Sequence, residues 1–201
     1  MKRLLFTVCL VVLLHPALRA QTVTPEDRAR AIKYLEKTGA GVFAATKGLS
    51  DAQWNFKPGP DRWSVAEVTE HIAAAEDFIR DSIREKVMTS PLVTGQADAK
   101  AVDDLVLKAV PDRSRKAQAP EPLRPTNRYG SPQASLKHFR ESRAMTLQFL
   151  KQTKDLRQHA ADSPMGKKLD GYEWVLFIAA HSERHTKQIE EVKADPSFPK
   201  K

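Results

Sequence analysis

The chain has 201 residues and a formal net charge of +8, and its only cysteine is Cys9. Beyond the first 20 residues no apolar run is long enough to cross a membrane, and no internal repeat is visible. The basic surplus is scattered along the chain, which indicates a solvated surface rather than a nucleic-acid-binding face, so no nucleic-acid partner is expected.

Residues 1–20 have the three-part pattern of a secretory signal peptide. A basic start precedes an apolar run over residues 4–14, and the small residue Ala20 stands at a plausible cleavage position. The alternative is an uncleaved segment that stays as an N-terminal anchor. Cleavage would lower the net charge from +8 to +5 and leave residues 21–201 without a thiol or disulfide. We expect an exported single domain, periplasmic or extracellular, with no membrane contact after cleavage.

The first helix is predicted to begin after Thr24, because threonine caps helices and Pro25 suits the first helical position. It should run to about Lys47. Residues 48–63 contain the sequence PGP and are predicted to form a loop. This loop carries several aromatic residues, which we expect to cover one end of the core, with ligand stacking as the alternative. They are Trp54, Phe56 and Trp63.

The second helix should start firmly at Ser64, because Ser64 and Glu67 have the spacing of a capping box. Its apolar stripe continues to about Met88, and His71 lies on that stripe about two turns in. Residues 89–130 are rich in proline and predict a long, mostly irregular crossover, in which residues 97–110 could form a helix. A crossover of this length allows neighbouring helices to run parallel.

The crossover carries a basic cluster at Arg113, Arg115 and Lys116. We interpret it as a solvated surface, with anion binding as the alternative. A third helix should begin at Ser131 and run to about Thr153. A linker over residues 155–170 and a fourth amphipathic helix over residues 172–192 follow. The pattern predicts an all-α protein, a four-helix bundle with a long crossover between helices 2 and 3.

Two histidines, His181 and His185, lie four residues apart in the apolar stripe of the fourth helix. At this spacing their imidazoles project from adjacent turns of one face and can bind one ion. Two histidines that only fill a core face are the alternative. Because His71 occupies the inner stripe of another helix, the three together predict a metal site with an open coordination position.

The sequence does not identify a catalytic residue. In HSERH the glutamate is Glu183, about 200 degrees round the helix from the first histidine, so this motif lacks the general base of HExxH metalloproteases. Three further residues are candidates for the pocket: Glu67, Gln188 and Arg143. Glu67 is also explained by capping, Gln188 by a polar core contact, and Arg143 either meets an anionic group inside or extends outward.

Two segments resemble the DinB-like superfamily of four-helix bundles. They are WNFKPGPDRWSVAEVTEHI (54–72) and GYEWVLFIAAHSERHTKQI (171–189), and the resemblance covers roughly residues 24–192. It implies a nickel or zinc ion bound by three histidines, at positions that match His71, His181 and His185. It also implies a metal-dependent hydrolase, as in YfiT-like proteins, or a thiol-dependent S-transferase that uses bacillithiol, mycothiol or glutathione. Export would separate the protein from those cytosolic thiols.

Two functions of different class follow. The first is an exported metal-dependent enzyme, a hydrolase or thiol S-transferase that acts on a small molecule and forms a homodimer. The second is a metal-binding or interaction bundle without turnover, which the missing general base favours. A purely structural bundle is a third reading, and three histidines at matched positions speak against it.

Overall fold

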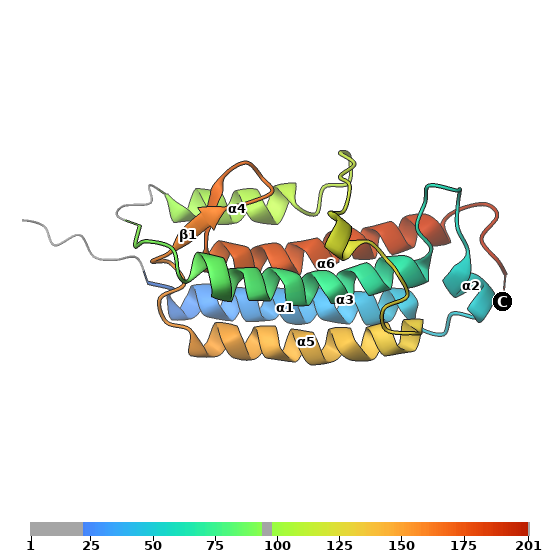
Figure 1. The fold of residues 1–201 in the computed structure, drawn as a ribbon, viewed down its shortest axis with the longest axis horizontal. Helices are drawn as coiled ribbons and strands as arrows, with labels where there is room; N and C mark the ends of the chain where they lie inside the picture. Colours follow the sequence, from blue (N-terminus) through green and yellow to red (C-terminus); the bar gives the residue numbers. More distant parts are fainter. Residues whose placement is uncertain (1–21, 94–97, 201) are drawn as a thin grey trace, which may run out of the picture.

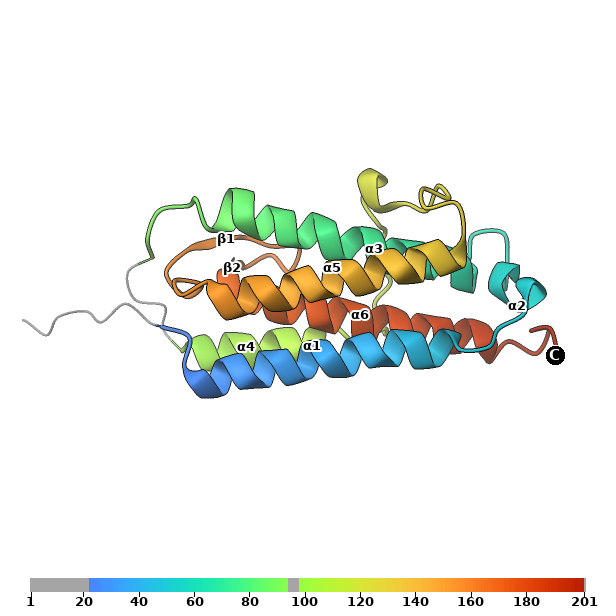
Figure 2. The same cartoon turned by 90° about the horizontal axis from the view of Figure 1, so that it is seen from below.

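The computed structural model describes residues 22–93 and 98–200, so the expected signal peptide lies outside the described residues. Four long helices lie side by side and form most of the molecule (Figure 1, Figure 2). They are α1 (Pro25–Thr46), α3 (Val65–Ser82), α5 (Pro132–Gln152) and α6 (Gly171–Lys193). The predicted all-α four-helix bundle is therefore confirmed. No helix within the described ranges is long and apolar enough to span a membrane.

The helices run in two parallel pairs. Helix α1 runs with α6, since Tyr172 contacts Asp27 near the start of both helices and Glu183 contacts Tyr34 further along. Helix α3 runs with α5 in the opposite direction (Figure 1). Because the long crossover returns the chain to the end where α3 begins, α5 can start there and run parallel to α3, as predicted.

The predicted helix starts agree with the caps in the structure. The Thr24 and Ser131 hydroxyls accept hydrogen bonds from backbone amides three residues ahead, and Ser64 forms the predicted capping box with Glu67. A capping box between Asp170 and Glu173 begins α6. After Ser82, α3 continues as a π-helical turn (Ile83–Val87), so the helical stretch ends close to the predicted Met88.

Two segments predicted to be irregular contain regular structure. The loop 48–63 includes the short helix α2 (Asp51–Asn55), which starts because Ser50 and Gln53 form a capping box. The linker 155–170 includes an antiparallel hairpin of β1 (Ala160–Asp162) and β2 (Lys168–Asp170). In both places a few tertiary or capping contacts ordered a segment whose composition indicated a loop.

The described part of the crossover contains a helix and a 3-10 turn. Helix α4 (Ala99–Ala109) agrees with the prediction for residues 97–110 and packs against α6. The 3-10 turn η2 (Glu121–Leu123) lies against α3. Further on, the carboxylate of Glu70 accepts hydrogen bonds from the backbone amides of Thr126, Asn127 and Arg128. The end of the crossover is thereby fastened to α3, because a charged acceptor binds three otherwise free amides.

The apolar core has two clusters along the bundle. One includes Leu35, Tyr172 and Ile178, and the other includes Trp54 and Phe139 at the α2 end. On α6 the first cluster ends at residue 180 and the second begins at residue 189. Residues 181–188 therefore lie between the two clusters, which leaves polar side chains room in the interior without displacing core packing.

Helix α6 begins at a very close approach to the preceding segment. A Cβ atom on Gly171 would lie 2.9 Å from the Leu156 carbonyl oxygen and 3.1 Å from Met88 Sδ. Replacing Gly171 with alanine should lower the free energy of unfolding by about 1–3 kcal/mol, since this backbone neighbour cannot move aside. Gly41→Ala is the control: its Cβ would meet Thr186 at an ordinary 3.8 Å, so we expect a gain of up to about 1 kcal/mol. Urea denaturation measures both, and equal shifts would contradict the prediction.

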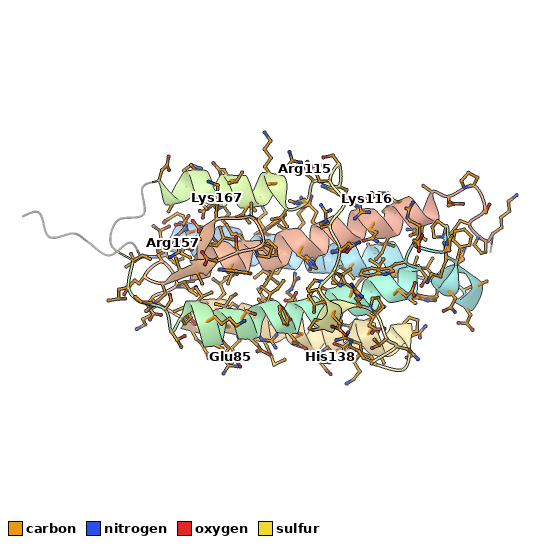
Figure 3. All side chains as sticks on the ribbon, turned by 45° about the horizontal axis from the view of Figure 1, so that its top comes forward. Glu85, Arg115, Lys116, His138, Arg157 and Lys167 are labelled. Carbon is orange, nitrogen blue, oxygen red and sulfur yellow. The ribbon has the colours of Figure 1, made fainter. Side chains whose placement is uncertain are left out.

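Arg157 lies at this end of the bundle (Figure 3) and is surrounded by buried acidic side chains. The guanidinium binds the carboxylates of Asp103 at 2.8 Å and Asp170 at 3.0 Å and lies 4.1 Å from the Tyr172 ring centroid. Glu173 is fully buried, and its Oε1 has no hydrogen-bond partner within the described residues. Burial, and then the charge of Asp170, raises the pKa of Glu173 to about 8. Burial likewise raises the pKa of Asp170 to about 6, against the opposing charge of Arg157.

The raised pKa of Glu173 predicts that the free energy of unfolding falls as the pH rises. Between the ordinary pKa of 4.5 and about 8, the folded protein keeps the Glu173 proton while the unfolded chain has lost it, so each rise in pH favours unfolding. In Glu173→Gln the fall between pH 5 and 8 should shrink by on the order of 1–3 kcal/mol. Glu190→Gln, at an exposed position of the same helix, is the control. Urea midpoints across this pH range give the measurement, and identical slopes in all three proteins would refute the assignment.

Candidate metal centre

His71 lies two turns into α3 and is oriented by the crossover. Its side chain is buried, and its Nδ1 lies 2.9 Å from the Leu123 carbonyl oxygen in η2. A carbonyl oxygen only accepts, so His71 Nδ1 carries a hydrogen and donates it. In the neutral ring Nε2 is then unprotonated and presents its lone pair.

His71 Nε2 points at the two histidines of α6. It lies 3.2 Å from His185 Nε2, which in turn lies 3.1 Å from His181 Nε2. The ligand atoms of all three residues lie within 4.8 Å of one another. The structure thus brings together the three histidines that the sequence singled out, because α3 and α6 pack side by side and present them from facing sides.

The nitrogen spacing fits a shared divalent ion. Two nitrogens, each about 2.0–2.1 Å from one zinc ion at a tetrahedral angle, lie about 3.3–3.4 Å apart. The observed 3.1 and 3.2 Å are close to that value. Because His71 already donates through Nδ1, its Nε2 has no hydrogen to share with His185, and a cation is the natural partner for such convergent lone pairs.

The surroundings keep the three rings neutral. Burial lowers the pKa of His71, and burial lowers the pKa values of His181 and His185 well below the ordinary 6.5. Mutual repulsion among the rings and the charges of nearby arginines act in the same direction. Neutral imidazole is the form that binds a metal, so the site is prepared for binding at neutral pH.

Aromatic side chains form part of the wall. The Trp63 ring centroid lies 5.0 Å from that of His71, and Phe177 stacks with His181 at 6.2 Å. Trp54, from the same predicted loop, is buried in the core instead. His71 and His185 are buried, whereas part of the His181 surface is exposed.

The two other polar candidates have different surroundings. Gln188 is beside the centre, with its Oε1 2.7 Å from His185 Nδ1. Glu67 accepts from the Ser64 backbone amide at 2.8 Å and from Lys57 Nζ at 2.9 Å, so both its oxygens are engaged in the cap. Glu183 points away as predicted and accepts from the Tyr34 hydroxyl at 2.8 Å.

Arg143 extends inward, where it binds a protein carboxylate. Its Nε and Nη2 each lie 2.7 Å from an oxygen of Glu76. The remaining hydrogens go to the Leu35 carbonyl, Thr38 and Ser182. All five donors are used, which leaves none for a substrate anion. Glu76 could have been found beforehand as an acid on the inner stripe of the second helix.

Several residues near the centre were missed or misread from the sequence. The Leu123 carbonyl was not anticipated, because a backbone oxygen has no sequence signal. Arg113 was assigned to a solvated basic cluster, yet it contacts Gln188 and Glu191. Arg115 and Lys116 do lie on the outside, where the crossover passes α6 (Figure 3).

The chain is similar to known proteins. The uncharacterized protein YuaE of Bacillus subtilis (strain 168) is 29% identical over 150 residues, which span 73% of this chain and 87% of YuaE. The solved structure of YfiT from Bacillus subtilis has a TM-score of 0.55 at 18% identity, over 89% of this chain and 93% of YfiT. YfiT is described as a probable metal-dependent hydrolase with an unusual four-helix bundle topology. A family model for the DinB superfamily matches residues 34–189, and the chain belongs to that superfamily.

Proposed function

We propose that this protein binds a divalent metal ion, nickel or zinc, through His71, His181 and His185, and that it is a metal-dependent enzyme acting on a small molecule. The observation that carries the proposal is the convergence of three Nε2 atoms from two helices, with neighbouring Nε2 atoms 3.1–3.2 Å apart. Three protein ligands are the number typical of catalytic sites, in which one coordination position stays open. The description of YfiT supports the same class of function.

The residues of the chain have separate roles in this proposal. His71 and His185 are buried and hold their Nε2 atoms toward the shared point, while Trp63 and Phe177 limit access of water. The partly exposed His181 marks the side from which a substrate approaches. When bound, the divalent ion supplies Lewis acidity and lowers the pKa of a water or thiol ligand.

Hydrolysis and thiol S-transfer are the two reaction classes we propose. Glu67 and Glu183 are both bound elsewhere, so neither is placed as a general base beside the histidines. A nucleophile that loses its own proton readily suits such a site, and a thiol does so more readily than water. A thiol transferase is therefore the finer form of the proposal, and a hydrolase is the form that the description of YfiT supports.

A second candidate is a metal-binding bundle without turnover. The observation that favours it is the same engagement of Glu67 and Glu183, which leaves the proposed site without an assigned acid or base. In that case the protein would bind the ion as strongly but would accelerate no reaction.

Metal analysis tests the proposed site, and a panel of substrates tests whether the protein is an enzyme or a binding module. Both use the wild type and two histidine variants. Wild-type protein loaded with nickel or zinc should retain about one ion per chain after desalting, and His185→Ala should retain almost none. His138→Ala is the matched control, because His138 lies on α5 (Figure 3) and contacts Asp77 and Tyr129 rather than the three ligand histidines. Retention of the ion by His185→Ala would overturn the site. Turnover of an ester or thiol-transfer substrate by the wild type alone would separate the enzyme from the binding module.

Export and self-association belong to the proposal as well. We propose that residues 1–20 are removed on export to the periplasm or the extracellular space, and that the remaining chain forms a homodimer. N-terminal sequencing of the protein from cell fractions tests export, and light scattering tests the dimer. An intact N-terminus in the cytoplasm, or a monomer mass at high concentration, would contradict these two parts.

A further inference from the structure

The crossover reaches both buried ligand histidines from outside the site: it contacts His71 directly and His185 through Gln188. It supplies the Leu123 carbonyl that accepts from His71. It also supplies Arg113, whose Nη1 lies 3.3 Å from Gln188 Oε1, the atom that contacts His185 Nδ1. The hydrogen-bond partners of Nδ1 in His71 and His185 thus both depend on the crossover, which the sequence predicted only as a mostly irregular segment.

Arg113 is held firmly in this position. Its Nε and Nη2 donate to the two carboxylate oxygens of Glu191 at 2.6 and 2.7 Å, a two-point contact that aims Nη1 at Gln188. The adjoining chain is fastened to the same helix, since Arg184 donates to the backbone carbonyls of Asp112 and Arg115. Glu191 and Gln188 lie three residues apart on α6, so one guanidinium reaches both.

This arrangement decides which nitrogen of His185 carries the hydrogen. A guanidinium has donors only, so the Gln188 atom that faces Arg113 must be the amide oxygen. The same oxygen faces His185 Nδ1, which must therefore donate, and the neutral ring then leaves Nε2 unprotonated toward the other histidines.

We infer that Arg113 is a positioning residue for the metal centre: through Gln188 it selects the Nδ1–H tautomer of His185 and so keeps Nε2 available as a ligand. The inference rests on the proposed function. Without Arg113 the Gln188 amide can rotate and offer its NH2 group to His185 Nδ1. That nitrogen then accepts, and the ring hydrogen moves to Nε2, where it competes with the ion.

The test uses nickel and zinc as probes on the full chain. In Arg113→Met we expect nickel and zinc affinity, measured by chelator competition, to fall about tenfold, the low end of the range for groups that orient a ligand. In the metal-free protein, 15N NMR of the imidazoles should show His185 as the Nδ1–H tautomer in wild type and a shift toward Nε2–H in Arg113→Met. Arg115→Met is the control. Arg115 is an exposed arginine of the crossover, and its contact with Arg184 uses its backbone oxygen, which the substitution keeps.

A second substitution at Gln188 tests whether Arg113 acts by selecting the tautomer of His185 or only by holding the crossover against α6. Gln188→Glu places an acceptor-only carboxylate beside His185, which holds Nδ1–H with or without Arg113. Arg113→Met should therefore cost little affinity in the Gln188→Glu background. The inference would be overturned if Arg113→Met kept full metal affinity and the Nδ1–H tautomer of His185. It would also be overturned if Gln188→Glu did not restore the metal affinity that Arg113→Met loses. Failure of wild-type protein to bind either metal would instead overturn the proposed function.

Discussion

Replacing Arg143 with methionine is expected to lower the free energy of unfolding by about 3–5 kcal/mol. The side chains of Arg143 and Glu76 are 7% and 1% exposed, and their two charge-assisted hydrogen bonds are both 2.7 Å long. The single substitution leaves the Glu76 carboxylate buried with only the Thr146 hydroxyl as a donor. An unpaired buried charge is far more costly than the pair is favourable, so the loss should be large.

The double variant Glu76→Leu with Arg143→Met should recover most of that loss. Removing both charges leaves no uncompensated ion. The hydroxyls of Thr38, Thr146 and Ser182 each keep a backbone carbonyl acceptor within their own helix. Lys137→Met, which breaks the exposed pair with Glu141 on α5, is the control and should cost less than about 0.5 kcal/mol. Urea denaturation followed by circular dichroism gives all values, and a double variant no more stable than the single one would contradict this account.

His71→Ala should remove the stabilisation that nickel or zinc confers on the folded protein. At a free metal concentration 100 times the Kd, binding to the folded state alone stabilises by about 2.7 kcal/mol. The substitution leaves His181 and His185, two ligands from one helix, and the metal then loses its bond to α3. We expect less than about 1 kcal/mol of metal-dependent stabilisation in the variant, because two histidines rarely complete a site.

Thermal unfolding with added metal and then with EDTA measures this effect. His138→Ala should be less stable than wild type without metal, since it loses contacts with Asp77 and Tyr129, but it should keep the full metal-dependent rise in Tm. An equal rise in Tm for His71→Ala and wild type would show that the ion binds elsewhere. A rise that EDTA fails to reverse would show that bound metal is not its cause.

Local signals identified the four long helices because their starts depend on neighbouring residues. Thr24, Ser64 and Ser131 cap the backbone amides three residues ahead, and such contacts need no distant partner. The signal was weaker where distant contacts order the chain. The hairpin of β1 and β2 and the short helix α2 were both assigned to irregular segments, since a few residues carry too little periodicity to reveal them.

The histidines were identifiable because each lies on an apolar helical stripe, where a titratable ring needs a reason to be buried. Spacing put His181 and His185 on one face, and the inner stripe of the second helix pointed to His71. The roles of Arg143 and Arg113 were not decidable in this way. Both side chains are long enough to reach several partners, and the partner depends on which helix or loop packs nearby.

The amino-acid sequence by itself determined the helical bundle, its capped starts, the parallel arrangement allowed by the crossover and the three histidines. These features follow from periodicity and from contacts a few residues apart. Only the tertiary structure decided that Arg143 binds Glu76, that Arg157 collects buried acids, and that Leu123 and Arg113 orient the rings. Those contacts join residues 13 or more positions apart in the sequence, and one of them uses a backbone oxygen, so their energy depends on packing that no local pattern encodes.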